Sequence, residues 1–396
     1  MAKYFYPLIE NPYRTKDISS AIKVLKTNRL TIGPQTEKFQ KEFSRKIKTK
    51  FSLMVNSGSS ANLLAVQCLI NPYRKKRLNV GDEVLIPALC WSTSLWPIIQ
   101  SGLKPKFVDI DYNTLNIDIE DLKKKIGKKT KAILLVHVLG NCTNMDQLMD
   151  IIKKRKLILI EDTCESLGSK FKKKYLGTFG NFSSFSFYSS HQISSGEGGM
   201  VCCSSQEDYE ILKSLRAHGW SRGLKNEKKI AYKNKHLDKR FIFYNSGFNV
   251  RSTDISASIG LSQFKDLDKF IKGRSQNRIK ILKEFNKNQR LKNNFEFLKE
   301  NKNVKASWFG LPILLSNKLN KNKIIKKLEK GGIETRPIIS GNFLKQPSIK
   351  KYKLNGKNKM KNAEKVNRYG FFIGLPTKKI GNTKLKKLIK HFENTL

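Results

Sequence analysis

The chain has 396 residues, of which 39% are hydrophobic and 10% aromatic, the composition of a protein with a large packed core. No apolar run reaches the roughly 18 residues that a membrane span needs, so we expect a soluble protein. The formal net charge of +46 would suit a nucleic-acid binder, because clustered Lys and Arg release counterions from phosphate backbones. The basic residues recur from end to end of the chain, however, which is typical of a solvated surface and indicates no nucleic-acid partner.

The N-terminus and the cysteines indicate a cytoplasmic protein. The first residues contain neither an apolar signal core nor a small-residue cleavage site, so we expect no export. Six cysteines are scattered along the chain without a CxxC pair. The only close pair, Cys202 and Cys203, is adjacent on an expected strand, where neighbouring side chains point to opposite faces. We therefore expect reduced thiols and neither a metal nor an iron–sulfur site.

Between about residues 50 and 205, short β-rich segments alternate with helical ones, as in α/β domains built on a mostly parallel sheet. One intervening helix is expected from Met145 to Lys154, because its apolar residues recur at helical spacing and Asn144 is suited to cap its first turn. Seven segments are expected to be strands: 52–56, 83–87, 106–110, 132–138, 157–162, 182–187 and 199–203.

After about residue 260 the pattern changes to elements typical of a smaller α+β domain. We expect a long lysine-rich helix, a strand over 308–315, a helix over 321–330 and a final helix ending near His391. The length of the chain also favours more than one core. The sequence thus predicts a large domain over residues 1–260 and a small one over residues 261–396.

The first segment that carries chemistry, residues 55–61, runs from a strand through small residues into a helix. Such a helix start offers unpaired N–H groups, hydroxyls and the positive end of the helix dipole to a phosphate. The segment lacks the lysine that follows the glycine loop of nucleoside-triphosphate sites, so that class is excluded. An ordinary capped helix is the structural alternative.

The second segment, residues 158–165, is an apolar strand that ends in the acidic pair Glu161 and Asp162. A carboxylate at such a strand end is able to keep a pyridine nitrogen protonated, which makes the ring an electron sink. The alternative is that the acidic pair caps a following helix.

The third segment, residues 183–199, is a strand that enters a hydroxyl-rich loop containing His191 and then a glycine turn. So many small polar residues after an apolar strand are hard to explain by packing, and α/β proteins place ligands at such strand ends. A lone histidine is more often structural than catalytic, but this one lies in the loop best suited to a buried polar ligand.

Together these segments resemble the DegT/DnrJ/EryC/StrS sugar aminotransferases, which are fold-type I enzymes that use pyridoxal phosphate (PLP). The resemblance extends from Gly33 to Gly374 and includes residues 307–312 and 334–343. The loop of this family typically carries a lysine before its glycine turn, and His191 occupies that position. This replacement resembles the sugar 3-dehydratase subgroup of the family.

The resemblance singles out eleven residues, of which Glu165 matches a ring-flanking position that varies among relatives and whose role stays open. It implies His191 as the catalytic residue. It also implies a homodimer with shared sites, in which Asn249 reaches the cofactor phosphate of the neighbouring subunit. The remaining cofactor contacts that it implies are Gly58, Ser59 and Ser186 at the phosphate, Trp91 stacked on the ring, Asp162 at the ring nitrogen and Glu165 beside the ring. The substrate-pocket candidates are His218, Glu334 and Arg336.

The function implied is removal of the C3 hydroxyl of a nucleotide-linked 4-keto-6-deoxy hexose by an enzyme that uses PLP and its amine form, pyridoxamine phosphate (PMP). L-glutamate would regenerate PMP, and the pathway implied is deoxysugar biosynthesis for lipopolysaccharide O-antigen. Because the family's lysine binds the cofactor covalently, a histidine in its place implies noncovalent binding. With an ordinary pKa near ~6.5, this histidine would be a base at neutral pH.

Three alternatives stay open at this point. One is an ordinary nucleotide-sugar aminotransferase, which the missing lysine disfavours. Another is the iron–sulfur type of dehydrase that acts on CDP-4-keto-6-deoxyglucose, whose cysteine-rich insertion has no counterpart in residues 216–244. The third is a noncatalytic relative, which would not need to retain Asp162, Ser186 and the glycine turns.

Overall fold

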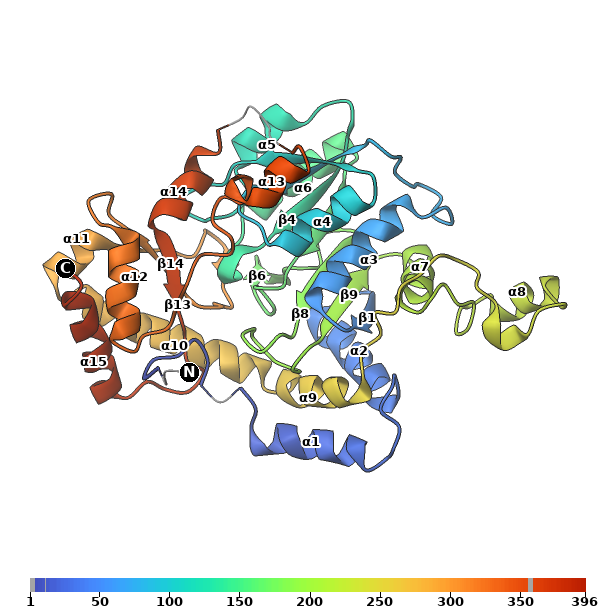
Figure 1. Cartoon of the computed structure of the whole chain (residues 1–396), viewed down its shortest axis with the longest axis horizontal. Coiled ribbons are helices and arrows are strands. Elements are labelled where there is room, and N and C mark those ends of the chain that lie inside the picture. The colour runs from blue at the N-terminus through green and yellow to red at the C-terminus, as the bar shows by residue number, and fades with distance from the viewer. Residues whose placement is uncertain (1–3, 11, 355–358) are drawn as a thin grey trace.

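The protein is described by a computed structural model that covers residues 4–10, 12–354 and 359–396. A seven-stranded sheet lies at its centre, in the order β1-β9-β8-β5-β4-β2-β3 (Figure 1). Within this sheet β9 runs antiparallel to both of its neighbours, and the other strands run parallel to one another. The strands are β1 (Phe51–Val55), β2 (Glu83–Pro87), β3 (Lys104–Val108), β4 (Thr130–Val136), β5 (Ile158–Asp162), β8 (Phe182–Ser186) and β9 (Gly199–Cys203).

This sheet confirms the predicted α/β fold class. All seven expected strands form, each within two residues of its expected bounds. The helix expected from Met145 is α6 (Met145–Arg155), and Asn144 caps it by accepting hydrogen bonds from the N–H groups of Asp146 and Gln147.

Helices cover both faces of the sheet because its strands are apolar on both sides. On one face, α2 (Pro34–Ile47) and α9 (Asp254–Phe264) pack on β8 and β9 through a cluster that includes Phe43, Phe185 and Cys202. On the opposite face, helix α3 (Gly58–Ile70) packs through a second cluster, which includes Cys203. The two adjacent cysteines therefore point to opposite faces, as expected. Other helices of this region are α1 (Thr15–Leu25), α4 (Ser92–Gln100), α5 (Ile119–Lys125), α7 (Gln206–Arg216) and α8 (Glu227–Lys233).

The C-terminal part forms a four-stranded antiparallel sheet in the order β10-β12-β14-β13. The strand expected over 308–315 begins only at Leu311, because the Phe309 N–H bonds to the carbonyl of Leu139 in the large-sheet region. The elements are β10 (Phe295–Phe297), β12 (Leu311–Leu315), β13 (Thr335–Arg336), β14 (Gly370–Ile373), α10 (Leu267–Phe285), α11 (Gln289–Asn294), α12 (Lys321–Lys330), α13 (Pro347–Lys351), α14 (Lys361–Tyr369) and α15 (Asn382–Glu393). A small third sheet contains β6 (Lys170–Phe171), β7 (Lys174–Tyr175) and β11 (Val304–Lys305).

The N-terminal segment packs with these C-terminal elements rather than with the large sheet. Tyr6 pairs with Ile333, and the Tyr6 hydroxyl donates to the carbonyl of Gly374 at 3.2 Å. The domain boundary near residue 260 stays a prediction.

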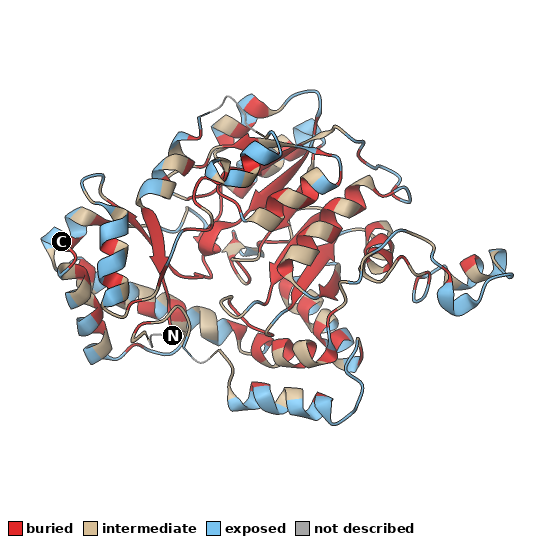
Figure 2. Ribbon diagram, viewed as in Figure 1, coloured by how far each residue is buried: buried red, intermediate tan, exposed pale blue. Residues whose placement is uncertain are grey.

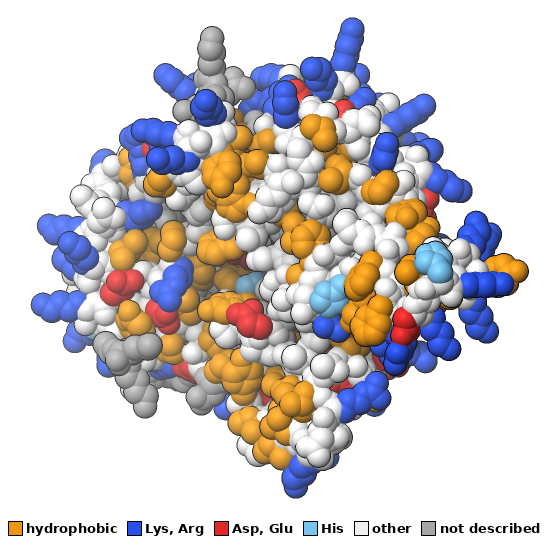
Figure 3. All heavy atoms as spheres, turned by 45° about the vertical axis from the view of Figure 1, so that its right-hand side comes forward, with side chains coloured by type: hydrophobic (Ala, Val, Ile, Leu, Met, Phe, Trp, Pro, Cys, Tyr) orange, Lys and Arg blue, Asp and Glu red, His pale blue; other side chains and the backbone are white. Residues whose placement is uncertain are grey.

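The surface is polar and basic. Figure 2 shows the strands of the large sheet buried, with the exposed residues on the outer sides of the helices and along the protruding α8 segment. On the face in Figure 3, Lys and Arg side chains are spread around the edge rather than gathered in one patch. No helix of the described residues is long and apolar enough to cross a bilayer.

One buried carboxylate joins the start of α2 to α9. Asp254 is 3% exposed, and its carboxylate accepts hydrogen bonds from the backbone N–H groups of Gly33, Gln35 and Thr36 and from the Thr36 hydroxyl. These N–H groups belong to the first turn of α2, which has no other acceptor for them within the helix.

We expect Asp254→Ala to lower the free energy of unfolding by about 3 kcal/mol, because it leaves buried donors without an acceptor. Denaturant unfolding measures this loss. The control is Asp268→Ala, since Asp268 is exposed and, within the described ranges, its ion-pair partner is Lys46 at the surface. Equal effects of the two substitutions would contradict the structural role of Asp254.

Candidate active site

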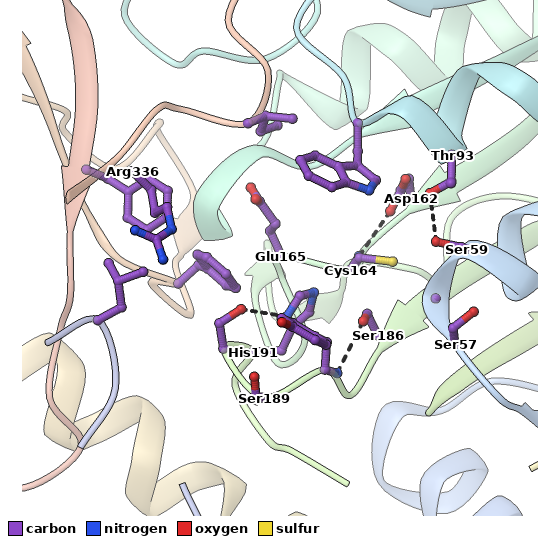
Figure 4. A pocket seen from close by; sticks show the side chains of 18 of the residues that line it. Ser57, Ser59, Thr93, Asp162, Cys164, Glu165, Ser186, Ser189, His191 and Arg336 are labelled. Atoms are coloured by element: carbon purple, nitrogen blue, oxygen red, sulfur yellow. Dashed lines mark hydrogen bonds between the residues drawn. The ribbon is translucent and has the colours of Figure 1, made fainter. Parts of the chain in front are cut away.

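A cavity of about 740 Å³ lies where the carboxyl ends of β5 and β8 face β13 and β14. Figure 4 shows Ser57, Ser59, Thr93 and Ser186 on one side, Arg336 on the other, and Glu165 and His191 between them. Nine of the residues predicted from the sequence line this cavity: Gly58, Ser59, Trp91, Asp162, Glu165, Ser186, His191, Glu334 and Arg336.

Asn249 and His218 are the predicted site residues that do not line this cavity. They lie beside each other at the end of α7, where Asn249 pairs with Ala217 and the His218 N–H donates to the carbonyl of Phe248 at 2.8 Å. The exposed Asn249 side chain accepts a hydrogen bond from Arg251 within its own chain.

The N-terminus of α3 and the end of β8 form a cradle of hydroxyl and N–H groups. Ser57 caps α3, and the Ser59 and Thr93 hydroxyls lie 2.9 Å apart. At Gly58 an added Cβ would lie 2.6 Å from the Cβ of Ser186, so only glycine lets the helix start approach the strand this closely. Such a cradle suits a phosphate group, because the N-terminus of a helix attracts anions.

Asp162 presents an anionic carboxylate to the cavity from the end of β5. Asn62 and Ser94 donate to its Oδ2 at 2.8 and 2.7 Å, and the Cys164 N–H donates to Oδ1 at 3.2 Å. These donors stabilise the charged form and fix its orientation. The side chain is 4% exposed, so a cationic ring nitrogen in the cavity would pair with it out of reach of solvent.

The neighbouring Glu161 has a different, structural role. Its fully buried carboxylate accepts from the N–H groups of Gly177, Phe179 and Gly180 at 2.7–2.8 Å and lies 3.0 Å from Nε2 of His137. The acidic pair noted in the sequence is therefore divided, with one carboxylate in the cavity and the other holding a turn.

His191 lies in the loop between β8 and β9 and presents its ring to the cavity. Its Nδ1 is 3.5 Å from the Ser190 hydroxyl, and Nε2 makes no hydrogen bond to any described residue. The ring meets the Phe309 ring edge-on at 5.1 Å between centroids. Burial, and after it the positive charge of Arg274, lower the pKa of His191 to about 3. The expectation of an ordinary pKa was therefore wrong, and the imidazole is uncharged at neutral pH.

Burial shifts the pKa of Glu165 upward, whereas it shifts that of His191 downward. Burial raises the pKa of Glu165 to about 7, although the Leu139 N–H donates to Oε2 at 2.9 Å and favours the anion. Glu165 is therefore shared between its neutral and charged forms near pH 7.

The far end of the cavity combines one ion pair with apolar side chains. Arg336 pairs with Glu334 at 2.7 Å, and Glu334 also accepts from the backbone N–H of Leu8 at 2.9 Å. The apolar lining of this end is Leu8, Ile9, Phe309, Pro337, Ile339 and Phe372. No lysine is found among the described residues that line the cavity.

The profile of the DegT/DnrJ/EryC1/StrS aminotransferase family matches residues 12–390. The chain belongs to this family. It is 38% identical over 374 residues to GDP-4-keto-6-deoxy-D-mannose 3-dehydratase of Escherichia coli O55:H7, which covers 93% of this chain and 95% of that one.

Solved structures of relatives confirm the PLP aminotransferase fold. The E. coli GDP-4-keto-6-deoxy-D-mannose-3-dehydratase with bound hydrated PLP superposes with a TM-score of 0.91 at 36% identity, over 98% of this chain and 100% of that one. A GDP-4-keto-6-deoxymannose-3-dehydratase with a trapped PLP–glutamate geminal diamine gives a TM-score of 0.89 at 36% identity, over 97% and 99% of the two chains.

Several cavity residues of this family member were not predicted from its sequence. Asn62 had a signal, because it is a polar residue one helical turn after Gly58 and is followed by a run of apolar residues. Leu8 had no signal in the sequence, because it contacts Glu334, which is 326 positions away along the chain.

Among the described residues, no group of three His, Cys, Asp or Glu side chains is placed to hold a metal ion.

We expect Gly58→Ala to weaken the binding of PLP about tenfold or more, because the new methyl group would press on Ser186 and widen the cradle. Titration by absorbance measures this affinity. The control is Gly127→Ala, where an added Cβ would meet only the flexible end of Lys106 at 3.9 Å. Unchanged PLP affinity in a folded Gly58→Ala variant would contradict the phosphate cradle.

Proposed function

We propose that the protein is a PLP- and PMP-dependent 3-dehydratase of a nucleotide-linked 4-keto-6-deoxy hexose that uses L-glutamate to regenerate PMP. One observation carries this proposal: His191 lines the cavity, and no lysine is found among the described lining residues. The similarity to 3-dehydratases supports the same reaction, and the histidine in place of the lysine disfavours transamination.

The residues present fit the cofactor. Ser59 and Ser186 with the α3 N-terminus would hold the phosphate, and the close packing at Gly58 leaves a cradle that a Cβ would disturb. Asp162 would hold the ring nitrogen protonated, and Trp91, which is 56% exposed at the cavity edge, offers a face for ring stacking. When bound as PMP, the cofactor supplies an amine for the C4 ketone and a ring that takes up electrons.

His191 would move the proton that this chemistry requires. Its Nε2 has no hydrogen-bond partner in the described chain and is free to take a proton at the reacting carbon. Because the imidazolium is strongly disfavoured here, His191 would pass that proton on to the leaving C3 hydroxyl, which departs as water. The same side chain thus acts first as base and then as acid.

We propose Glu334 and Arg336 as the substrate-side pair. Arg336 is half exposed and has a single carboxylate partner among the described residues, which leaves guanidinium N–H groups for an anionic or hydroxyl-rich ligand. Glu165 lines the same cavity and belongs to the cofactor side of the site.

We also propose a homodimer, located in the cytoplasm, in which Asn249 completes the partner's site. The position of Asn249 outside its own cavity supports this assembly. The segment that contains α8 protrudes from the body in Figure 1 and exposes large aromatic rings, which supports burial against a second copy. These rings are Tyr232 (70% exposed), Phe241 (58%) and Phe243 (61%).

His191→Asn should lower the dehydration rate by about 10²- to 10⁴-fold, because it removes the acid–base group and keeps a polar side chain of similar size. Mass analysis of the nucleotide-sugar product measures the rate with GDP- and CDP-linked 4-keto-6-deoxy sugars. PLP affinity should stay unchanged and serves as the control. Wild-type dehydration by this variant would refute the central role of His191.

The complementary variant is His191→Lys, which should bind PLP covalently and lose dehydration. Borohydride should then raise the mass of the variant by the reduced cofactor, while the wild-type mass stays unchanged. A reduced adduct on the wild-type protein would show that another lysine anchors the cofactor.

For the shared site, mixing Asn249→Ala subunits with His191→Asn subunits should restore activity that neither variant has alone. In a mixed dimer one of the two sites receives both native residues, so random pairing yields about a quarter of the wild-type activity. Light scattering measures the molar mass and so tests whether the protein is a dimer. If the mixture stays as inactive as its components after subunit exchange, Asn249 does not act across the dimer.

A further inference from the structure

Arg274 is a buried cation directly behind the catalytic loop. It lies on α10, is 5% exposed, and has no carboxylate within ion-pair distance in the part of the chain that the structure describes. Its Nη2 donates to the carbonyl of His191 at 3.1 Å and its Nη1 to the carbonyl of Trp308 at 3.4 Å, while Nε has no partner. Burial lowers its pKa to about 10, so it is still charged at neutral pH.

Such a cation is costly for stability. A buried charge needs a counter-charge or a full set of hydrogen bonds, and two carbonyl groups supply only part of that compensation. An apolar side chain of similar volume would fill the same space without this cost. The position of Arg274 is therefore better explained by what its charge and its N–H groups do for His191.

The N–H groups hold the loop. Beside Arg274, the Gln192 amide donates to the carbonyls of Glu165 and Ser307, so two consecutive loop residues are fastened to the segment around Ser307 and Trp308. That segment continues into Phe309, whose ring meets the imidazole of His191 edge-on. The backbone and the ring of His191 are thus positioned by the same segment.

The charge acts on the imidazole. Beside the ring of His191, its own loop supplies Ser190 and Tyr188, and the 307–309 segment supplies Phe309. The charged side chain of this loop that lines the cavity is Glu197. After burial, Arg274 is the group that lowers the pKa of His191. The other charged side chains lining the cavity are Asp162, Glu165, Glu334 and Arg336.

We propose that Arg274 is a positioning residue, which holds the backbone of His191 against the segment at Trp308 and places a positive charge behind the loop while the imidazole takes a proton from the reacting carbon. This inference rests on the proposed function, because it assigns Arg274 to the proton transfer by His191. An uncharged imidazole has a lone pair free for the proton, and the nearby positive charge makes the imidazole a weaker base but the imidazolium that forms a stronger acid. The proton then goes to the C3 hydroxyl oxygen as its C–O bond breaks and water leaves.

Two substitutions separate the charge of Arg274 from its hydrogen bonds. Arg274→Gln removes the charge and keeps N–H donors, whereas Arg274→Lys keeps the charge and loses the forked geometry. Arg278→Gln on the same helix is the matched control, since Arg278 binds the carbonyl of Leu298 and stacks on Trp308 instead. Arg274→Met is a second charge-free variant if Arg274→Gln does not fold.

The measurement is an NMR titration of the imidazole protons without substrate or cofactor, so it does not depend on turnover. The chain has five histidines, and His191→Asn identifies the resonance of His191 by its loss. We expect the His191 midpoint to shift upward by about one pH unit or more in Arg274→Gln and to stay at its wild-type value in Arg274→Lys and Arg278→Gln. In turnover, Arg274→Lys should lower kcat with little change in KM, because the loop is misplaced while the charge state is kept.

The inference is overturned if the His191 midpoint in folded Arg274→Gln, or in Arg274→Met in its place, equals that of the wild type. It is equally overturned if Arg274→Lys shifts the midpoint as far as Arg274→Gln does. The proposed function fails separately, when the wild type shows the expected titration but does not dehydrate any 4-keto-6-deoxy nucleotide sugar.

Discussion

The site depends on the close approach of three backbone segments at one edge of the large sheet. The start of α3 at Gly58 touches the end of β8 at Ser186, and an added Cβ at Gly199, the first residue of β9, would lie 2.4 Å from the backbone of Ser57. Glycine is required at both contacts, because any side chain would force the strand and the helix apart. This packing brings a helix N-terminus, a serine hydroxyl and the loop that carries His191 around one cavity.

Within that cavity, burial and the number of hydrogen-bond donors determine how each ionisable side chain is stabilised. The Asp162 carboxylate accepts hydrogen bonds from four groups, whereas that of Glu165 accepts one, and burial raises the pKa of Glu165 to about 7. Burial, and after it the positive charge of Arg274, lower the pKa of His191 to about 3, so its imidazole is neutral. A fixed anion for the ring nitrogen and a neutral base for the reacting carbon are what proton-dependent elimination requires, whereas a lysine at position 191 would add a covalent bond to the cofactor.

The strands and the site residues at their ends could be predicted from the sequence, because both show in short stretches of the chain. The strands are short apolar runs bounded by turns, and Asp162 and Ser186 are the last residues of two of them, where α/β proteins place ligands. The family resemblance then assigned both residues to the cofactor. Leu8 and Arg274 could not be found in this way, since each reaches the site through a tertiary contact from a distant part of the chain. The low pKa of His191 was likewise hidden, because burial and the charge of Arg274 exist only in the folded protein.

The large positive charge tells less about function than the few charges that the fold buries. The carboxylates of Asp17, Glu161, Asp208 and Asp254 are buried, and each is held by backbone N–H groups, an arginine or both. Substituting any of them would leave donors or a cation uncompensated, whereas most of the lysines are solvated and contribute little to stability when exchanged. A surplus of lysine can therefore accumulate on the surface of this chain without changing its core or its cavity, where the described lining residues include Arg336 as their single basic side chain apart from His191.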